Sequence, residues 1–255
     1  MAILASINQQ VFQNIAQAIK DVHGQIRSET SEMLGLRTHN SKHFLTWDQL
    51  FTALIENFEG SGLVVSLTKK SGPWQFVLLY DIESKSLISI LKDKRLADLK
   101  LERQNRLVPH YQDALNSINI DKPAIEGQEI IEGVCVQPPE YMEAVRNRLG
   151  YLCEGIPFDN GGTNVDNHVV ICFDESLGNV SSITAYVLNF EWDIVDEKDI
   201  SDYIALDIGF EESQLDVERV DVPKLKLKDK ALDRAGKSSK QLLRPIQEEL
   251  ASGTN

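Results

Sequence analysis

Hydrophobic residues recur at helical spacing in two stretches near the N-terminus, three or four residues apart, which places them on one face of a helix. The first stripe consists of Ile7, Val11, Ile15, Ala18 and Val22, and the second of Trp47, Leu50, Phe51, Leu54, Ile55 and Phe58. Ser6 with Gln9, and Thr46 with Gln49, have the spacing of capping boxes. We therefore predict two amphipathic helices that begin near Ser6 and Thr46.

After residue 62 the pattern changes to short apolar runs that are separated by turn residues. These runs cover 63–68, 74–80, 87–91, 130–136, 169–173 and 183–192. The first three are joined by tight turns and predict an antiparallel meander. The sequence leaves open whether the two strand clusters, 63–91 and 130–192, form one sheet or two.

Helical patterns flank these strands. One begins at Asp93 and is interrupted by Pro109, which is tolerated in the first turn of a new helix but not in a helix interior. Further helices are predicted at 138–149 and 200–206. Strands and helices do not alternate strictly, which disfavours a Rossmann or barrel fold.

These patterns predict an α+β fold. It has N-terminal helices, two clusters of mainly antiparallel strands flanked by helices, and a basic helical C-terminal tail. We predict one globular domain over residues 1–222, with a sub-domain boundary near 120–128 left open, and a tail over 223–255.

Charge is distributed unevenly along the 255 residues, whose net charge is −13. This balance argues against a surface that is basic throughout and coats nucleic acid. Residues 191–221 carry twelve acids and two bases, whereas residues 224–244 carry eight bases and two acids. The tail could therefore dock on the acidic segment or on a partner.

The cysteines, the N-terminal sequence and the lengths of the apolar runs indicate the cellular compartment of the protein. Cys135, Cys153 and Cys172 are widely spaced, so they form no CxxC pair and are expected to be buried thiols. The N-terminus has no basic, apolar leader pattern. The longest apolar runs are shorter than the roughly 20 residues of a membrane span. We expect a cytoplasmic protein.

One candidate catalytic pattern combines an arginine with His110. Arg103, followed by His110 after six residues, has the spacing seen in HEPN ribonucleases, in which the two side chains cooperate in RNA cleavage, and Arg106 is the alternative partner of His110. That family is all-helical and carries both residues on one helix, whereas here Pro109 intervenes. The alternative is an arginine that caps a helix and a histidine that packs.

A second candidate catalytic pattern lies at a predicted turn. Glu83 and Lys85 form the Glu-x-Lys half of a restriction-type nuclease site, with Asp81 two residues earlier. That chemistry requires Mg²⁺, which carboxylates hold, and a lysine that assists water. Polar residues are also typical of turns. Outside this nuclease hypothesis, we expect no metal and no cofactor.

Candidate partner-binding residues follow from the two charged segments. The acidic candidates are Glu191, Asp193, Asp196, Glu197, Asp199, Asp202, Glu211 and Glu212, and the basic ones are Lys224, Lys226, Lys228, Lys230 and Arg234. Charge runs are commonly solvated faces. The alternative is a surface that attracts an oppositely charged partner.

Two stretches resemble an uncharacterised family of bacterial and phage proteins. They are Tyr80–Leu91 with the following Lys94-Arg95-Leu96 and His110-Tyr111, and Ile183–Asn189 with the acidic turn Val195–Asp199. The resemblance brings no known activity or substrate. It implies an association with antiphage defence or toxin–antitoxin systems.

The sequence therefore favours a non-enzymatic accessory protein that binds a protein partner through the acidic face, the basic tail, or both. A nuclease, either metal-dependent or HEPN-like, is the first alternative. An acidic mimic of DNA that inhibits a nucleic-acid-binding protein is the second. Nucleic acid itself is expected to bind only at the basic tail, and the oligomeric state stays open.

Overall fold

The computed structural model describes residues 2–23, 42–125, 138–157, 164–176 and 179–205, all within one compact unit, Met1–Gly209. The predicted strand 130–136 and the predicted tail 223–255 lie outside the described residues. In the part that is described, no helix combines the length and the apolar character required to cross a membrane.

Six strands form one sheet in the order β1-β2-β3-β4-β5-β6. They are β1 (Val64–Ser71), β2 (Trp74–Asp81), β3 (Ser86–Lys92), β4 (Asn167–Ser176), β5 (Asn179–Leu188) and β6 (Ile194–Asp199). Neighbouring strands are antiparallel except for β3 and β4, which are parallel. This parallel pair joins the two predicted clusters into one sheet, and the predicted α+β class is confirmed.

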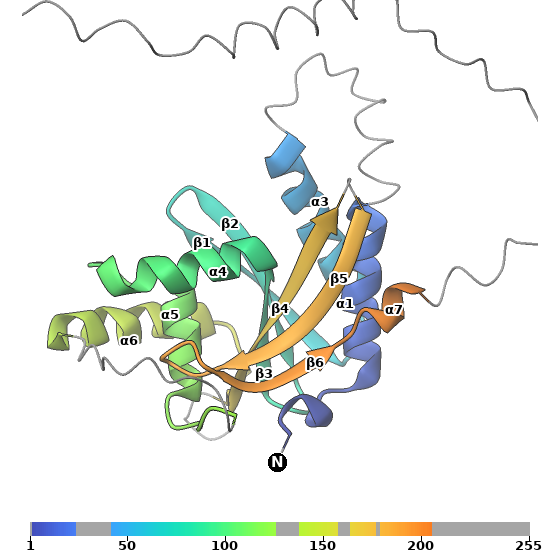
Figure 1. The fold of residues 1–255 in the computed structure, drawn as a ribbon. Coiled ribbons are helices and arrows are strands. Elements are labelled where there is room, and N and C mark those ends of the chain that lie inside the picture. The colour runs from blue at the N-terminus through green and yellow to red at the C-terminus, as the bar shows by residue number, and fades with distance from the viewer. Residues whose placement is uncertain (1, 24–41, 126–137, 158–163, 177–178, 206–255) are drawn as a thin grey trace, which may run out of the picture. The chain divides into compact units, whose positions relative to one another are not determined.

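Helices cover both faces of the sheet (Figure 1). The α-helices are α1 (Gln9–Asp21), α3 (Lys42–Phe58), α4 (Asp93–Glu102), α5 (Tyr111–Asn116), α6 (Pro139–Cys153) and α7 (Asp202–Ala205). On one face, Trp47 of α3 contacts Phe173 of β4, with ring centroids 5.9 Å apart. On the other face, Gln112 of α5 donates a hydrogen bond to Ser89 of β3, and α6 packs against α5.

Two predicted helix starts were wrong by a few residues. The cap of α1 is Asn8, whose side chain accepts a hydrogen bond from the Gln10 amide, while Ser6 lies in the preceding 3-10 turn Leu4–Ser6. Helix α3 begins at Lys42, so Thr46 lies inside it. A capping-box spacing also occurs by chance in polar sequence, which is why it misplaced these boundaries.

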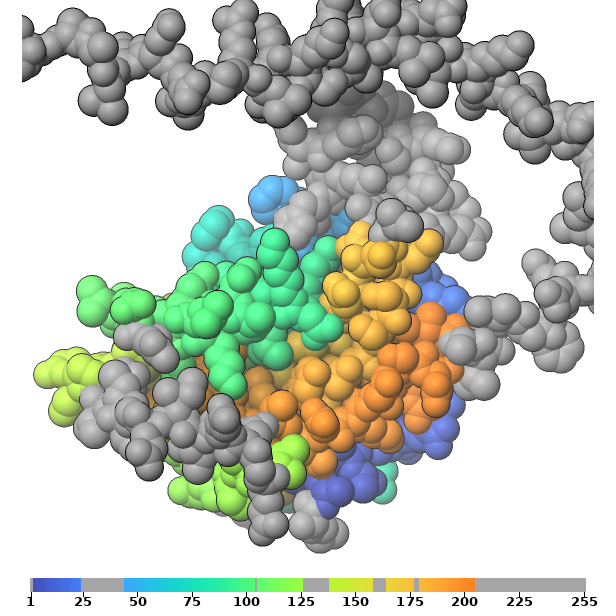
Figure 2. Space-filling view, in the orientation of Figure 1, coloured from blue at the N-terminus to red at the C-terminus, as the bar shows by residue number. Residues whose placement is uncertain are grey.

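Strand β6 was not predicted, because its acidic sequence lacks the apolar alternation of a strand. It lies at one edge of the sheet, where Lys198 packs over the Phe12 ring of α1. The Asp196 carboxylate accepts a hydrogen bond from the Leu4 amide, at 2.8 Å. Figure 2 shows β6 at the surface beside the N-terminal segment. The apolar run predicted to reach Trp192 instead ends as a strand at Leu188, and Trp192 occupies a turn with φ +67°.

A buried carboxylate ties three segments together. Asp113 of α5 is fully buried. It accepts hydrogen bonds from Arg106 Nη1 at 2.7 Å, from the His110 amide at 2.7 Å and from Trp192 Nε1 at 3.0 Å. These contacts connect the α4–α5 linker, the start of α5 and the β5–β6 turn. Burying a charged carboxylate is costly unless hydrogen-bond donors surround it, so the loss of any of these donors would destabilise the folded protein.

We predict that Asp113→Ala destabilises the protein by about 3–5 kcal/mol, because it leaves the Arg106 charge inside without its partner. Urea unfolding followed by circular dichroism measures this loss. The control is Asp121→Ala at an exposed position, which should change stability by less than about 0.5 kcal/mol. Equal losses for the two variants would contradict the assigned role of Asp113.

Candidate functional site

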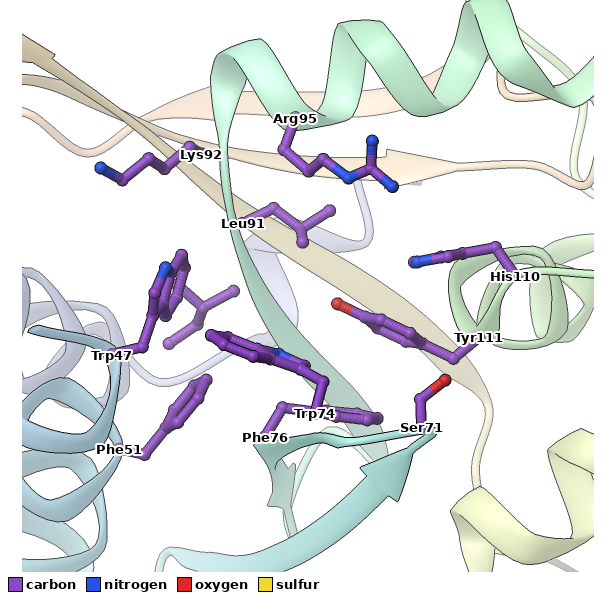
Figure 3. Close-up of a pocket in the computed structure, with 11 residues that line it drawn as sticks. Trp47, Phe51, Ser71, Trp74, Phe76, Leu91, Lys92, Arg95, His110 and Tyr111 are labelled. Carbon is purple, nitrogen blue, oxygen red and sulfur yellow. The ribbon is translucent and has the colours of Figure 1, made fainter. Parts of the chain in front are cut away.

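A cavity opens where strands β2 and β3 separate. These strands pair only over Leu79–Asp81 and Ser86–Ile88, although each continues for several residues. Beyond that point the space between them is a cavity of about 320 Å³ (Figure 3). Its lining consists of Trp47, Phe51, Ser71, Trp74, Phe76, Ile90, Leu91, Lys92, Arg95, His110 and Tyr111. We refer to it as the aromatic pocket.

Aromatic rings form the walls of this pocket and hold one another in place. Trp47 contacts Trp74 edge to face, with centroids 6.1 Å apart. Phe76 stacks on Tyr111 at 4.3 Å. Trp47, Phe76 and Tyr111 are each less than one-tenth exposed. Because these rings are fixed by packing, the pocket is already formed and does not need to be assembled by a ligand.

Within the part of the chain that the structure describes, two cations and no carboxylate belong to the lining. Lys92 lies at the end of β3, where its Nζ is 2.6 Å from the Glu175 carboxylate. Arg95 lies one turn into α4 and pairs with Glu102 at 3.0 Å. Both partners of the Arg95 pair are about half exposed, so this ion pair is weak and the guanidinium can turn to a ligand. The rim therefore favours negative charge.

His110 contributes a neutral polar group to the pocket. It caps α5, and its Nδ1 accepts a hydrogen bond from the Gln112 amide at 3.2 Å, which leaves the proton on Nε2. Burial, followed by the positive charge of Arg106, lowers the pKa of His110 to about 4, and Arg95 and Arg148 add to this effect. At neutral pH the ring, which points into the pocket in Figure 3, is a hydrogen-bond donor without charge.

A shallower groove adjoins the aromatic pocket, with a volume of about 420 Å³. Ser71 lines both hollows, and Pro109 of the groove precedes His110 of the pocket. The groove is lined by Lys70, Ser71, Gly72, Val108, Pro109, Ala144, Asn147, Arg148 and Tyr151. It again includes two cations and no carboxylate.

The tip of the β1–β2 hairpin stands between the two hollows. Its two-residue turn is Gly72-Pro73, and Gly72 has φ +61°. A positive φ followed by proline is the combination of a type II′ turn, which requires glycine at this position. The hairpin is also held by Lys69, whose Nζ bonds to the carbonyls of Tyr151 and Glu154 at the end of α6.

The structure separates the residues of the HEPN-like pattern. Arg103 begins a 3-10 turn after α4, pairs with Glu191 at 2.8 Å and packs over the Phe190 ring. Arg106 is committed to Asp113 and also bonds to the Leu99 carbonyl. His110 starts a different helix, α5. The one-helix arrangement of that family is therefore absent here, although Arg106 lies near enough to His110 to affect its pKa.

Glu83 and Lys85 lie in the turn between β2 and β3, at the far end of β3 from His110. Ile90 of the pocket lies five positions after Lys85 along β3, a distance of roughly 17 Å. Asp81 accepts hydrogen bonds from the amide and hydroxyl of Ser84, so it stabilises the turn. Among the described residues, no group of three or more His, Cys, Asp or Glu could hold a metal ion.

The candidate partner-binding residues, acidic and basic, fall into three groups. Glu191 pairs with Arg103, and the Asp196 carboxylate accepts a hydrogen bond from the Leu4 amide. The Asp193 backbone amide donates to Asn189 within the β5–β6 turn. Glu197, Asp199 and Asp202 are exposed on β6 and α7. The remaining candidates, Glu211, Glu212, Lys224, Lys226, Lys228, Lys230 and Arg234, lie outside the described residues.

A buried series of side-chain contacts from Ser89 through His168 to Asn116 was not predicted from the sequence. His168 Nε2 lies 2.9 Å from Ser89 Oγ, and His168 Nδ1 lies 3.0 Å from Asn116 Oδ1. This is the order of contacts in a hydrolytic triad. All three residues are nearly or fully buried, and neither hollow described above is lined by any of them. The chain of contacts connects β3, β4 and α5 and holds the sheet to the helix.

The pocket aromatics were predicted as core residues, because a ring at an apolar position has the same pattern in a core and in a cavity wall. Only the point at which the β2–β3 pairing ends distinguishes a core position from a cavity wall here.

The described cysteines, Cys153 and Cys172, are free and buried, and burial raises the pKa of both thiols. They are protonated at neutral pH and are poor nucleophiles.

Comparison with known protein families matches residues 4–247 to a family of unknown function, DUF5986. The chain belongs to this family. Neither the curated proteins nor the solved structures that were searched gave a match. The DUF5986 match spans every described helix and strand. The resemblance to an uncharacterised family is thus confirmed, and the family carries no activity to transfer to the pocket.

We predict that acid destabilises the protein below pH 6.5. Burial lowers the pKa of His168 to about 3 and that of His110 to about 4. As the pH falls from 6.5 to 4, the unfolded chain binds protons at these residues that the folded chain does not. Each histidine then lowers the free energy of unfolding by up to roughly 1.4 kcal/mol per pH unit.

Urea unfolding at pH 7.5 and 5.5 measures this loss, and NMR of the imidazole protons identifies its source. The signals of His110 and His168 should not titrate above pH 5 in the folded protein. In urea they should titrate near pH 6.5. A folded-state midpoint near 6.5 for either residue would contradict its assigned environment.

Proposed function

We propose that this member of DUF5986 acts by binding and not by catalysis, as an accessory protein. The observation that carries the proposal is the aromatic pocket, in which fixed rings adjoin Lys92 and Arg95 and no carboxylate of the described residues belongs to the lining. Such a site suits a flat or apolar group that carries or adjoins negative charge. Cationic groups such as methylated lysine, which aromatic cages also attract, are repelled by this rim.

The surroundings of the pocket support binding over nuclease chemistry. Arg103 and Arg106 are engaged by Glu191 and Asp113. His110 is surrounded by arginines and holds its proton on Nε2, so it is a weak base at this position. Mg²⁺ belongs only to the nuclease alternative, whose residues Glu83 and Lys85 lie at the other end of β3.

A second binding surface is part of this proposal. Strand β6 forms the sheet edge farthest from the pocket hairpin and exposes Glu197 and Asp199. An acidic edge strand attracts a basic protein partner over a distance and discourages pairing with other sheets. We assign the proposed protein partner to this edge, with the charged segments beyond residue 205 as further candidates.

The cellular setting that we propose is the cytoplasm of a bacterium, within an antiphage-defence or toxin–antitoxin system. The two buried, free cysteines support a reducing compartment. The defence setting rests on the sequence resemblance alone.

We predict that the intact chain binds anionic ring compounds without cleaving nucleic acid. The melting temperature is measured with a panel of nucleotides, oligonucleotides and acidic peptides that contain tyrosine or tryptophan. At least one class should raise it, since a ligand that binds the folded state stabilises it. DNA and RNA should remain intact with and without Mg²⁺.

Trp74→Leu removes one ring wall and should abolish the stabilisation, whereas Trp74→Phe should largely retain it. Cleavage that disappears in His110→Ala or Glu83→Ala would overturn the proposal in favour of a nuclease. A panel in which no member raises the melting temperature of the intact chain would overturn the pocket as the binding site.

A further inference from the structure

The lining of the two adjoining hollows differs in charge from the rest of the chain. The chain has 39 acidic and 26 basic residues. Among the described residues, the charged side chains that line the aromatic pocket and its neighbouring groove are Lys70, Lys92, Arg95 and Arg148, with no Asp or Glu. In a protein this acidic, an acid-free lining across two adjacent hollows indicates an anionic ligand that extends over both.

The positive charge is reinforced around the shared boundary. His110 lies close enough to Arg95, Arg106 and Arg148 for their charges to lower its pKa. Arg148 Nη1 donates a hydrogen bond to the Pro109 carbonyl, which fixes one guanidinium beside the groove. The segment 69–110 has nine Lys or Arg against five Asp or Glu, so the local excess is not limited to the lining.

Both hollows have aromatic rings in their lining. Trp74 and Trp47 form a corner in the pocket, and Figure 3 shows the Trp74 ring beside the space that the Tyr111 hydroxyl also faces. In the groove, Tyr151 is 43% exposed, and its hydroxyl accepts a hydrogen bond from the Lys70 amide at 3.0 Å. A pocket of about 320 Å³ admits one ring system with its substituents, and not a folded domain.

Resting on the proposed function, we infer that the ligand is a single strand of nucleic acid, with one base in the aromatic pocket and the next nucleotide over the groove. Stacking on tryptophan and tyrosine holds bases without regard to sequence, and the four cations follow the phosphates. The neutral Nε2–H of His110 can donate to a base edge or to a phosphate oxygen. Duplex DNA is excluded, because its bases are stacked and cannot enter the pocket.

The test measures binding of the full-length protein to fluorescein-labelled dodecathymidylate and dodecauridylate by fluorescence anisotropy. Competitors are the mononucleotides, a dodecamer duplex and an acidic peptide that contains tryptophan. We expect one or both strands to bind, and the duplex and the mononucleotides to compete at least about tenfold more weakly.

Two matched pairs of variants assign the binding to this site. Arg95→Ala should weaken binding and lower the slope of log affinity against log salt by about 0.7, the value for one contact to a single strand. Lys94→Ala changes the same charge at the exposed neighbouring position and should leave the slope unchanged. Trp74→Leu should weaken binding at least about fivefold, and Trp74→Phe should restore most of it.

Three results would overturn the inference. If the labelled oligonucleotides bind equally well to all four variants, they are held elsewhere, in the basic segment 224–244. Mononucleotides that compete as well as the dodecamer would show a site for a free nucleotide. Binding of the acidic peptide alone, lost in Arg95→Ala, would overturn the nucleic-acid ligand while the proposed binding function stands.

Discussion

The Asp113 carboxylate is the contact on which the arrangement of the site depends. It holds the Arg106 guanidinium, the amide of His110, the residue that caps α5, and the indole of Trp192 in one buried cluster. Helix α5 has only six residues, which is too short to be stable by itself. Its position, and with it the His110 and Tyr111 side chains of the pocket, is therefore set by this carboxylate. The same contact explains why Arg106, which resembles a catalytic residue, serves the fold, while Arg103 is held separately by Glu191.

Much of the fold could be predicted from the sequence because local patterns decide it. The apolar stripes of α1 and α3 and the meander from β1 to β3 follow directly from spacing and turn residues. The parallel pairing of β3 with β4 could not be predicted, because more than seventy residues separate the two strands and no local pattern records which strands become neighbours. Strand β6 escaped prediction because its residues are acidic, and its strand conformation is imposed by pairing with β5.

The candidate site was harder to predict than the fold. His110 was identified, but as half of an Arg–His pair, and the structure places it instead in an aromatic cavity. Trp47 and Trp74 have the spacing of ordinary core residues. They become cavity walls only because the β2–β3 pairing ends at Leu79 and Ile88. No residue in the sequence signals this ending, since both strands continue with apolar residues that fit a longer ladder equally well.

The attachment of the β1–β2 hairpin has a mechanical consequence. The hairpin is joined to β3 by a short ladder at its base and to the end of α6 by Lys69. Its tip separates the pocket from the groove, so the two hollows share one wall. Any shift of the tip toward α6 narrows the groove and widens the pocket, and the opposite shift does the reverse. The widths of the two hollows are thus geometrically coupled through the residues of this shared wall.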